Sequence, residues 1–208
     1  MSGGEGVGSN GRNSAAAAAP AHRGLQLGPE GWVHGDGVRR LPSPHHDARP
    51  AGTTIDLLVL HNITLPPGGF GGDHIAAFFR GTLDLAAHPF FATLAGARVS
   101  AHFVIERSGR ITQFVSCHDR AWHAGASVHR GRARCNDFSV GVELEGTDFT
   151  PFCDAQYAAL AALTAALRAG LPITLACGHS DIAQDRKTDP GPLFDWTQFT
   201  AQTGLARG

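Results

Sequence analysis

The chain has 208 residues and a formal net charge of −1, and no long basic run stands out, so a nucleic-acid partner is not expected. A core of about 180 residues can bury roughly 70% of its unfolded-chain surface, so one domain can be stable without disulfides. No apolar run approaches the length of a membrane span, and neither a membrane nor a particular protein partner is indicated.

The cysteine pattern and the N-terminal segment both bear on the compartment. The four cysteines lie far apart without a CxxC pair, which is typical of reduced thiols in a cytoplasmic protein. Residues 1–24 are rich in Gly, Ser, Asn and Ala, so we expect a disordered low-complexity tail before a single domain at 25–208. The tail lacks the cationic start and long apolar centre of a signal peptide, and its glycine and acidic content argues against a transit peptide. These features predict a cytoplasmic location.

The first half of the domain alternates extended and irregular segments. Residues 25–53 are punctuated by Pro and Gly and predict an extended arm packed on the domain. Residues 55–60 are nearly all apolar and predict a central strand, followed at its carboxyl end by His61 and Asn62, where catalytic groups often lie. Residues 73–80 predict a short helix with Asp73 as N-cap, and residues 82–97 predict a loop.

Three further strands follow, and a turn joins the first two. Residues 103–106 and 111–115 flank a short Ser-Gly turn, which predicts a β-hairpin. The segment 138–144 then alternates, with apolar Phe138, Val140, Val142 and Leu144 at every second position. Because a strand has a period of two, Glu143 and Glu145 should lie on the face opposite these apolar residues.

The last third predicts two helices around one strand. Residues 154–168 predict a helix with Asp154 as N-cap and an apolar stripe that includes Leu160 and Leu163, ended by Gly170 and Pro172. Residues 173–177 predict a strand that leads to His179, and residues 195–203 predict a short closing helix.

Three residues of this chain could hold a metal. His61 and His179 each follow an apolar run, and Asp189 lies in the Pro-Gly turn ten residues after His179. Two imidazoles and one carboxylate, with a fourth position open, form a known type of catalytic zinc site. The alternative is a hydrogen-bonded strand-end histidine and a turn-capping aspartate, and spacing alone leaves both interpretations open.

Other polar residues have a catalytic and a structural interpretation. Glu143 could be a general base, although most strand glutamates face solvent. Lys187 could stabilise an oxyanion, although most lysines are ordinary surface residues. Trp122 and His123 could line a groove, or the tryptophan could be a half-buried structural residue.

Eight motifs in colinear order resemble the AmpD-type N-acetylmuramoyl-L-alanine amidases, over residues 28–199. They are PSPH at 42–45, LVLHNI at 58–63, LPPG at 65–68, VSAH at 99–102, RAWHAG at 120–125, RCNDFS at 134–139, ELEGTD at 143–148 and RKTDPGP at 186–192.

The resemblance implies a fold, a cofactor and a reaction. The fold is the α/β amidase fold shared with peptidoglycan recognition proteins, a mixed central β-sheet with helices packed on its faces. The cofactor is one zinc ion per chain, held by His61, His179 and Asp189. The reaction is hydrolysis of the amide between 1,6-anhydro-N-acetylmuramic acid and L-alanine in muropeptides, a step of cytosolic peptidoglycan recycling.

The resemblance also assigns roles to single residues. Glu143 would be the base that activates the attacking water, and Lys187 would stabilise the tetrahedral intermediate. The positions that would line the sugar–peptide groove are Asn62, Arg98, Ala121, Trp122 and Arg134. The arm departs from the family pattern at His46 and Ala48, where an aromatic residue and a cysteine are usual.

Three alternatives remain from the sequence. The first is an amidase acting on intact cell-wall peptidoglycan, which the absent signal peptide and unpaired cysteines disfavour. The second is a non-catalytic muropeptide-binding module, for which a missing zinc ligand would be the sign. The third is a domain that works chiefly through a protein partner.

Overall fold

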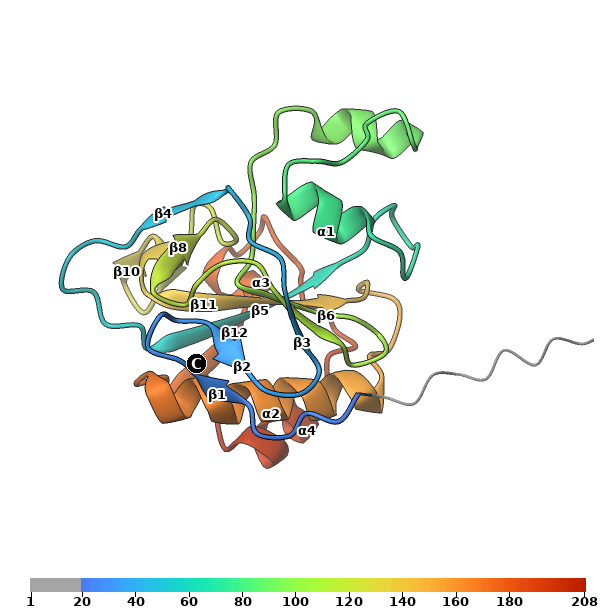
Figure 1. The fold of residues 1–208 in the computed structure, drawn as a ribbon. Helices are drawn as coiled ribbons and strands as arrows, with labels where there is room; N and C mark the ends of the chain where they lie inside the picture. Colours follow the sequence, from blue (N-terminus) through green and yellow to red (C-terminus); the bar gives the residue numbers. More distant parts are fainter. Residues whose placement is uncertain (1–19) are drawn as a thin grey trace, which may run out of the picture.

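The computed structural model describes residues 20–208 (Figure 1). Residues 1–19 of the predicted disordered tail lie outside the described residues. Residues 20–24 were also assigned to that tail, yet they contact the domain: the amide of Asp36 donates a hydrogen bond to the carbonyl of Arg23 over 3.1 Å. The boundary at residue 24 stays a prediction.

A seven-stranded mixed β-sheet forms the centre of the protein. Its strands in spatial order are β13 (Ala206–Arg207), β12 (Leu175–Gly178), β5 (Leu57–Ile63), β11 (Ser139–Glu145), β6 (Phe103–Ile105), β7 (Ile111–Gln113) and β3 (Val38–Arg40). The five strands from β13 to β6 run parallel to their neighbours, whereas β6 and β7 form the predicted antiparallel hairpin.

Strand β5 differs from its predicted bounds because pairing carries it further. It extends to Ile63 since its last three residues continue in register with β11, so His61 and Asn62 lie within the strand rather than after it. Local composition cannot show this extension, because the two polar residues interrupt the apolar run.

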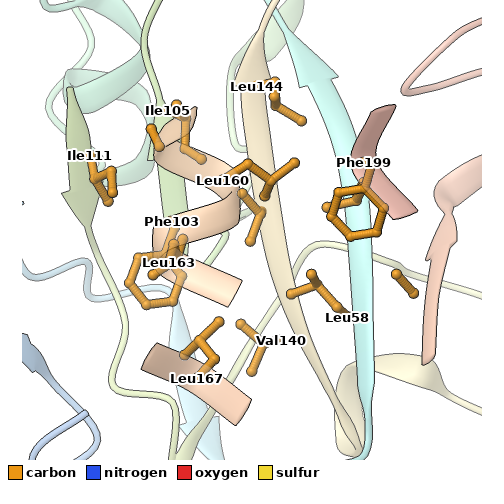
Figure 2. Packing of buried hydrophobic residues seen from close by; sticks show 14 of the residues in the cluster. Leu58, Phe103, Ile105, Ile111, Val140, Leu144, Leu160, Leu163, Leu167 and Phe199 are labelled. Carbon is orange, nitrogen blue, oxygen red and sulfur yellow. The ribbon is translucent and has the colours of Figure 1, made fainter. Parts of the chain in front are cut away.

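Helices α2 (Asp154–Gly170) and α4 (Trp196–Thr203) cover one face of the sheet (Figure 1). Figure 2 shows the apolar stripe of α2 packed on the alternating apolar residues of β5 and β11. The labelled residues of this core include Leu58, Val140, Leu144, Leu160 and Leu163. The predicted stripe and strand alternation therefore meet in one core.

Two details at the ends of these elements were predicted wrongly. The N-cap of α2 is Cys153, with extended backbone, rather than Asp154, because the Gln156 side chain accepts from the Cys153 amide over 3.1 Å and draws that residue into the cap. Phe138 precedes β11 and packs in a separate cluster with Leu57 and Val59, so it does not share the face of Val140.

Helix α1 (His74–Phe79) and the 3₁₀ helix η1 (Pro89–Leu94) lie on the opposite side of the sheet (Figure 1). The segment predicted as a loop thus contains η1, because the His88 ring caps it at the Phe90 amide over 3.1 Å and Phe91 is fully buried. Asp73 occupies the N-cap position of α1, but its side chain makes no capping hydrogen bond.

The predicted arm packs on the domain through short strands. Strands β1 (Gln26–Leu27) and β2 (Val33–His34) pair with each other, and β1 contacts α2. Strand β4 (His46–Ala48) pairs antiparallel with β8 (Asp119–Ala121). His46 and Ala48, at which the arm departs from the family pattern, therefore lie in a paired strand.

The remaining short elements lie between or after the longer strands along the chain. They are the paired strands β9 (Val128–His129) and β10 (Arg132–Ala133), the 3₁₀ helix η2 (Cys135–Asp137) and the single-turn helix α3 (His179–Ile182). Within residues 20–208, no helix combines the length and the apolar character needed to cross a bilayer.

Candidate active site

Three adjacent strands bring the site residues to one edge of the sheet. His61 of β5 is the register partner of Glu143 of β11, so both side chains lie on the face away from α2. His179 directly follows Gly178, which pairs with Leu60, and is thereby placed level with His61. The carboxyl ends of parallel strands are the usual position of ligand sites in such sheets.

His61, His179 and Asp189 converge on one point. The Nδ1 atoms of His61 and His179 lie 3.1 Å apart, and they lie 2.9 and 3.0 Å from Oδ2 of Asp189. In a tetrahedral zinc site with bonds of about 2.0–2.1 Å, neighbouring ligand atoms are about 3.3 Å apart. The predicted ligand set is therefore assembled with the spacing that a small cation requires.

The turn that carries Asp189 is held tightly against His179. The amide of Ser180 donates to the carbonyl of Asp189 over 2.9 Å. A Cβ at Gly178 would lie 2.8 Å from Cδ of Pro190, so only glycine permits this close approach. Burial alone would raise the pKa of Asp189, but the neighbouring rings of His179 and His61 outweigh it and lower that pKa.

The far nitrogen of each ligand histidine has its own partner. Nε2 of His179 donates to the carbonyl of Ala124 over 3.2 Å, and Nε2 of His61 lies 3.0 Å from Nδ1 of His123. Burial lowers the pKa of His61, which favours the neutral ring that a metal requires. A neutral histidine with its proton on Nε2 offers an unprotonated Nδ1, so the donor set fits a zinc ion.

Glu143 lies beside this group with an unusual environment for a carboxylate. The residue is only 9% exposed, and Oε2 has no hydrogen-bond partner among the described residues. Burial and the nearby charge of Asp189 raise the pKa of Glu143 well above its usual value, and Lys187 acts in the opposite direction. A buried carboxyl with a raised pKa is suited to accepting and returning a proton near neutral pH.

A cavity of about 730 Å³ opens over these residues. His61, Glu143, His179, Lys187 and Asp189 all line it. Lys187 is exposed, so its ammonium can reach a group bound there.

The structure separates the residues expected to bind substrate into two groups. Asn62 and Trp122 line the cavity. Ala121 is buried in β8, Arg98 is exposed, and Arg134 pairs with Asp137 at 3.1 Å; none of these three lines the cavity. Their roles stay predictions.

Sequence reasoning missed other residues of the cavity wall. Asp148 accepts a hydrogen bond from Nδ2 of Asn62 over 2.7 Å, and Phe149 is 88% exposed at the rim. Asp148 is the last residue of the ELEGTD segment that carries Glu143, and Phe149 follows it, so proximity in sequence was the available signal.

Comparison with known families identifies the family of this chain. The sequence profile of N-acetylmuramoyl-L-alanine amidase matches residues 51–192, which includes every proposed metal ligand. The chain belongs to the N-acetylmuramoyl-L-alanine amidase family. This amidase is 58% identical over 172 residues to 1,6-anhydro-N-acetylmuramyl-L-alanine amidase AmpD of Escherichia coli, covering 82% of this chain and 93% of that relative.

Solved structures place this amidase in the expected fold. A crystal structure of a selenomethionine AmpD derivative superposes with a TM-score of 0.81 at 56% identity, covering 84% of this chain and 97% of the other. The Escherichia coli amidase AmiD, in a complex with anhydro-N-acetylmuramic acid-L-Ala-D-γ-Glu-L-Lys, gives a TM-score of 0.55 at 30% identity, covering 88% of this chain and 66% of the other. The predicted mixed-sheet amidase fold is confirmed.

Proposed function

We propose that this amidase hydrolyses the amide bond between 1,6-anhydro-N-acetylmuramic acid and L-alanine in muropeptides. The observation that carries the proposal is the convergence of His61, His179 and Asp189 beside the buried Glu143, at the base of one cavity. Relatives that cover most of this chain have the 1,6-anhydro-N-acetylmuramyl-L-alanine amidase activity in their names, which supports this choice of substrate.

His61, His179 and Asp189 are the residues that would hold one zinc ion per chain. When bound, zinc would act as a Lewis acid on the scissile carbonyl and acidify water. The three donor atoms, two unprotonated nitrogens and one carboxylate oxygen, favour zinc over Mg²⁺ or Ca²⁺, which prefer oxygen ligands.

Glu143 and Lys187 would carry out the proton transfer and charge stabilisation. Glu143 takes a proton from the attacking water and returns it to the leaving amine of L-alanine. Lys187 offsets the charge that develops on the carbonyl oxygen, a contribution of about 3 kcal/mol if it acts like a single oxyanion donor. Both residues line the cavity but come from distant parts of the chain, which supports separate roles for them.

The cavity supplies the surfaces for the sugar and the peptide. The side-chain nitrogen of Asn62 donates to Asp148, so the side-chain oxygen of Asn62 can accept a hydrogen bond from a bound amide. Trp122 offers a half-buried indole at the wall, a surface on which a sugar ring can pack. Arg98, Ala121 and Arg134 would act from the surroundings of the cavity.

The state of the cysteines supports a choice of compartment for the reaction. All four cysteines lie within the described residues and none forms a disulfide, which supports a reducing, cytoplasmic location and a role in recycling muropeptides.

Mass spectrometry of the products tests the proposed reaction. Incubation with a 1,6-anhydro-muropeptide should give the free anhydro sugar and a peptide that begins with L-alanine. A reducing-end muropeptide and intact peptidoglycan, tested in parallel, should be cleaved more slowly. Binding without any released peptide would contradict an enzymatic function, and faster cleavage of intact peptidoglycan would contradict the proposed substrate.

A further inference from the structure

His123 links a proposed metal ligand to the interior of the domain, although nothing in the proposed mechanism uses it. Its Nδ1 lies 3.0 Å from Nε2 of His61, and its Nε2 lies 3.3 Å from Oγ of Ser139. Oγ of Ser139 in turn donates to the carbonyl of Cys135 over 2.6 Å. The four groups form a continuous chain that ends at the backbone.

The end of this chain sets the direction of every hydrogen bond in it. A carbonyl oxygen only accepts, so the Ser139 hydroxyl proton is committed to Cys135 and its oxygen can accept from Nε2 of His123. Nδ1 of His123 is then an acceptor, and it receives the Nε2 proton of His61. Neutral His61 thus has its free lone pair on Nδ1, the atom that faces His179 and Asp189.

The opposite tautomer of His61 would be incompatible with a metal. It would place a proton on Nδ1, between two other donor atoms that lie 2.9 and 3.1 Å away, and would block the position of a cation.

The His123 ring occupies a space that is left open by a glycine in the neighbouring strand. The ring meets His61 edge to face, with centroids 5.1 Å apart. A Cβ at Gly141 would lie 2.5 Å from Cγ of His123, so a side chain at residue 141 would displace the ring. Gly141 belongs to the same strand as Glu143, which ties the ring position to the catalytic strand.

We infer that His123 is a positioning residue: with Ser139, it holds His61 in the tautomer and orientation that present Nδ1 to the metal. This inference rests on the zinc site of the proposed function. It adds a role for a loop residue that lines the same cavity but is not among the converging donor atoms.

Zinc affinity, measured by competition with a chromogenic chelator, tests the inference without substrate. His123→Leu removes the acceptor for His61 and should weaken zinc binding about 10- to 100-fold, the usual effect of losing a partner of a metal ligand. Ser139→Ala removes only the last link, so it should weaken binding less.

A conservative variant separates positioning from a general structural role. In His123→Asn, the amide oxygen lies near the place of Nδ1 and can accept from His61, so most of the zinc affinity should return. His34→Asn is the matched control, because His34 is exposed on β2 and belongs to the arm. Its zinc affinity should equal that of the wild type.

Unfolding of a variant must be distinguished from a lost acceptor. The thermal midpoint of each metal-free variant shows whether it is folded. If His123→Leu is unfolded, the zinc affinities of Ser139→Ala and His123→Asn test the role of His123 instead. Nitrogen NMR of the metal-free wild type should also find the His61 proton on Nε2.

Two results would overturn the role of His123 while leaving the proposed function intact. One is wild-type zinc affinity in a folded variant that lacks the acceptor, and the other is equally weak binding by His123→Asn and His123→Leu. A wild-type protein that binds no zinc would instead overturn the metal site and this inference together.

Discussion

Glu143 is the residue whose chemistry depends most on its surroundings. Replacement by glutamine keeps its size but removes the proton acceptor, so turnover should fall by about 10²- to 10⁴-fold, the usual contribution of a general base. Zinc content should be unchanged, because Glu143 is not among the converging donor atoms. Activity assays and elemental analysis of the same preparation check both expectations. Near-normal turnover would remove Glu143 from the mechanism.

Asp47 has a structural role, because it connects the arm to Trp122. Its carboxylate accepts hydrogen bonds from Nε of Arg120 over 2.7 Å and from Nε1 of Trp122 over 3.1 Å. The hydrogen bonds from Arg120 have the largest effect on the pKa of Asp47, and the one from Trp122 adds to it. Together they outweigh the effect of partial burial and lower this pKa to about 2.

This low pKa predicts how the free energy of unfolding changes with pH. A group whose pKa is depressed by folding stabilises the protein above its unfolded-state pKa, here 3.8, and this contribution disappears as the pH falls toward 2. Urea unfolding of wild type and Asp47→Asn should therefore differ by a constant amount from pH 7 to about 5, and the difference should shrink as the pH falls further. The side chain is 43% exposed, so the effect should be modest. A difference that grows on acidification would contradict the assignment.

Arg49 is one of the residues that connect the arm to the central sheet. Its guanidinium donates to the carbonyls of Cys117, Asn136, Asp137 and Ser139, over 2.8–3.2 Å. Three of these carbonyls, those of Asn136, Asp137 and Ser139, belong to η2 and the start of β11, the strand of Glu143. Arg49 thus holds the start of β11.

Loss of that connection should cost stability. Arg49→Gln should lower the free energy of unfolding by about 2 kcal/mol or more, since one hydrogen bond to a charged group contributes about 1.5–3 kcal/mol and several acceptors lose their donor. Chemical denaturation measures the change. Arg80→Gln is the control, because Arg80 is exposed at the end of α1. Equal stability of the two variants would refute the proposed role of Arg49.

Elements whose signal is local were predicted well from the sequence. The alternation in β11 and the stripe of α2 encode their buried faces directly, and the core of Figure 2 joins them. The 3₁₀ turn around Phe91 and the pairing of β4 with β8 were not predicted, because each depends on contacts with distant segments. Of the site, the metal ligands were named from motif resemblance, whereas Asp148 and the hydrogen bonds of His123 require the folded arrangement.

For the molecule as a whole, the central sheet acts as a rigid support with two different faces. Helices α2 and α4 cover one face (Figure 1), which carries the apolar core. The other face carries the proposed metal ligands, Glu143 and the cavity. Because His61 and Glu143 are neighbours in register, their separation is set by backbone hydrogen bonds rather than by flexible loops. The site should therefore be largely formed before zinc or substrate arrives.

Zinc dependence of turnover follows from this arrangement and can be measured on the intact chain. The protein is first freed of metal with a chelator, and zinc is then added in small steps while release of the L-alanyl peptide from a 1,6-anhydro-muropeptide is followed. Activity should rise in proportion to zinc and level off at one ion per chain, and Asp189→Ala should not reach this plateau. Full activity in the metal-free protein, or a plateau unchanged by Asp189→Ala, would contradict a catalytic zinc site at His61, His179 and Asp189.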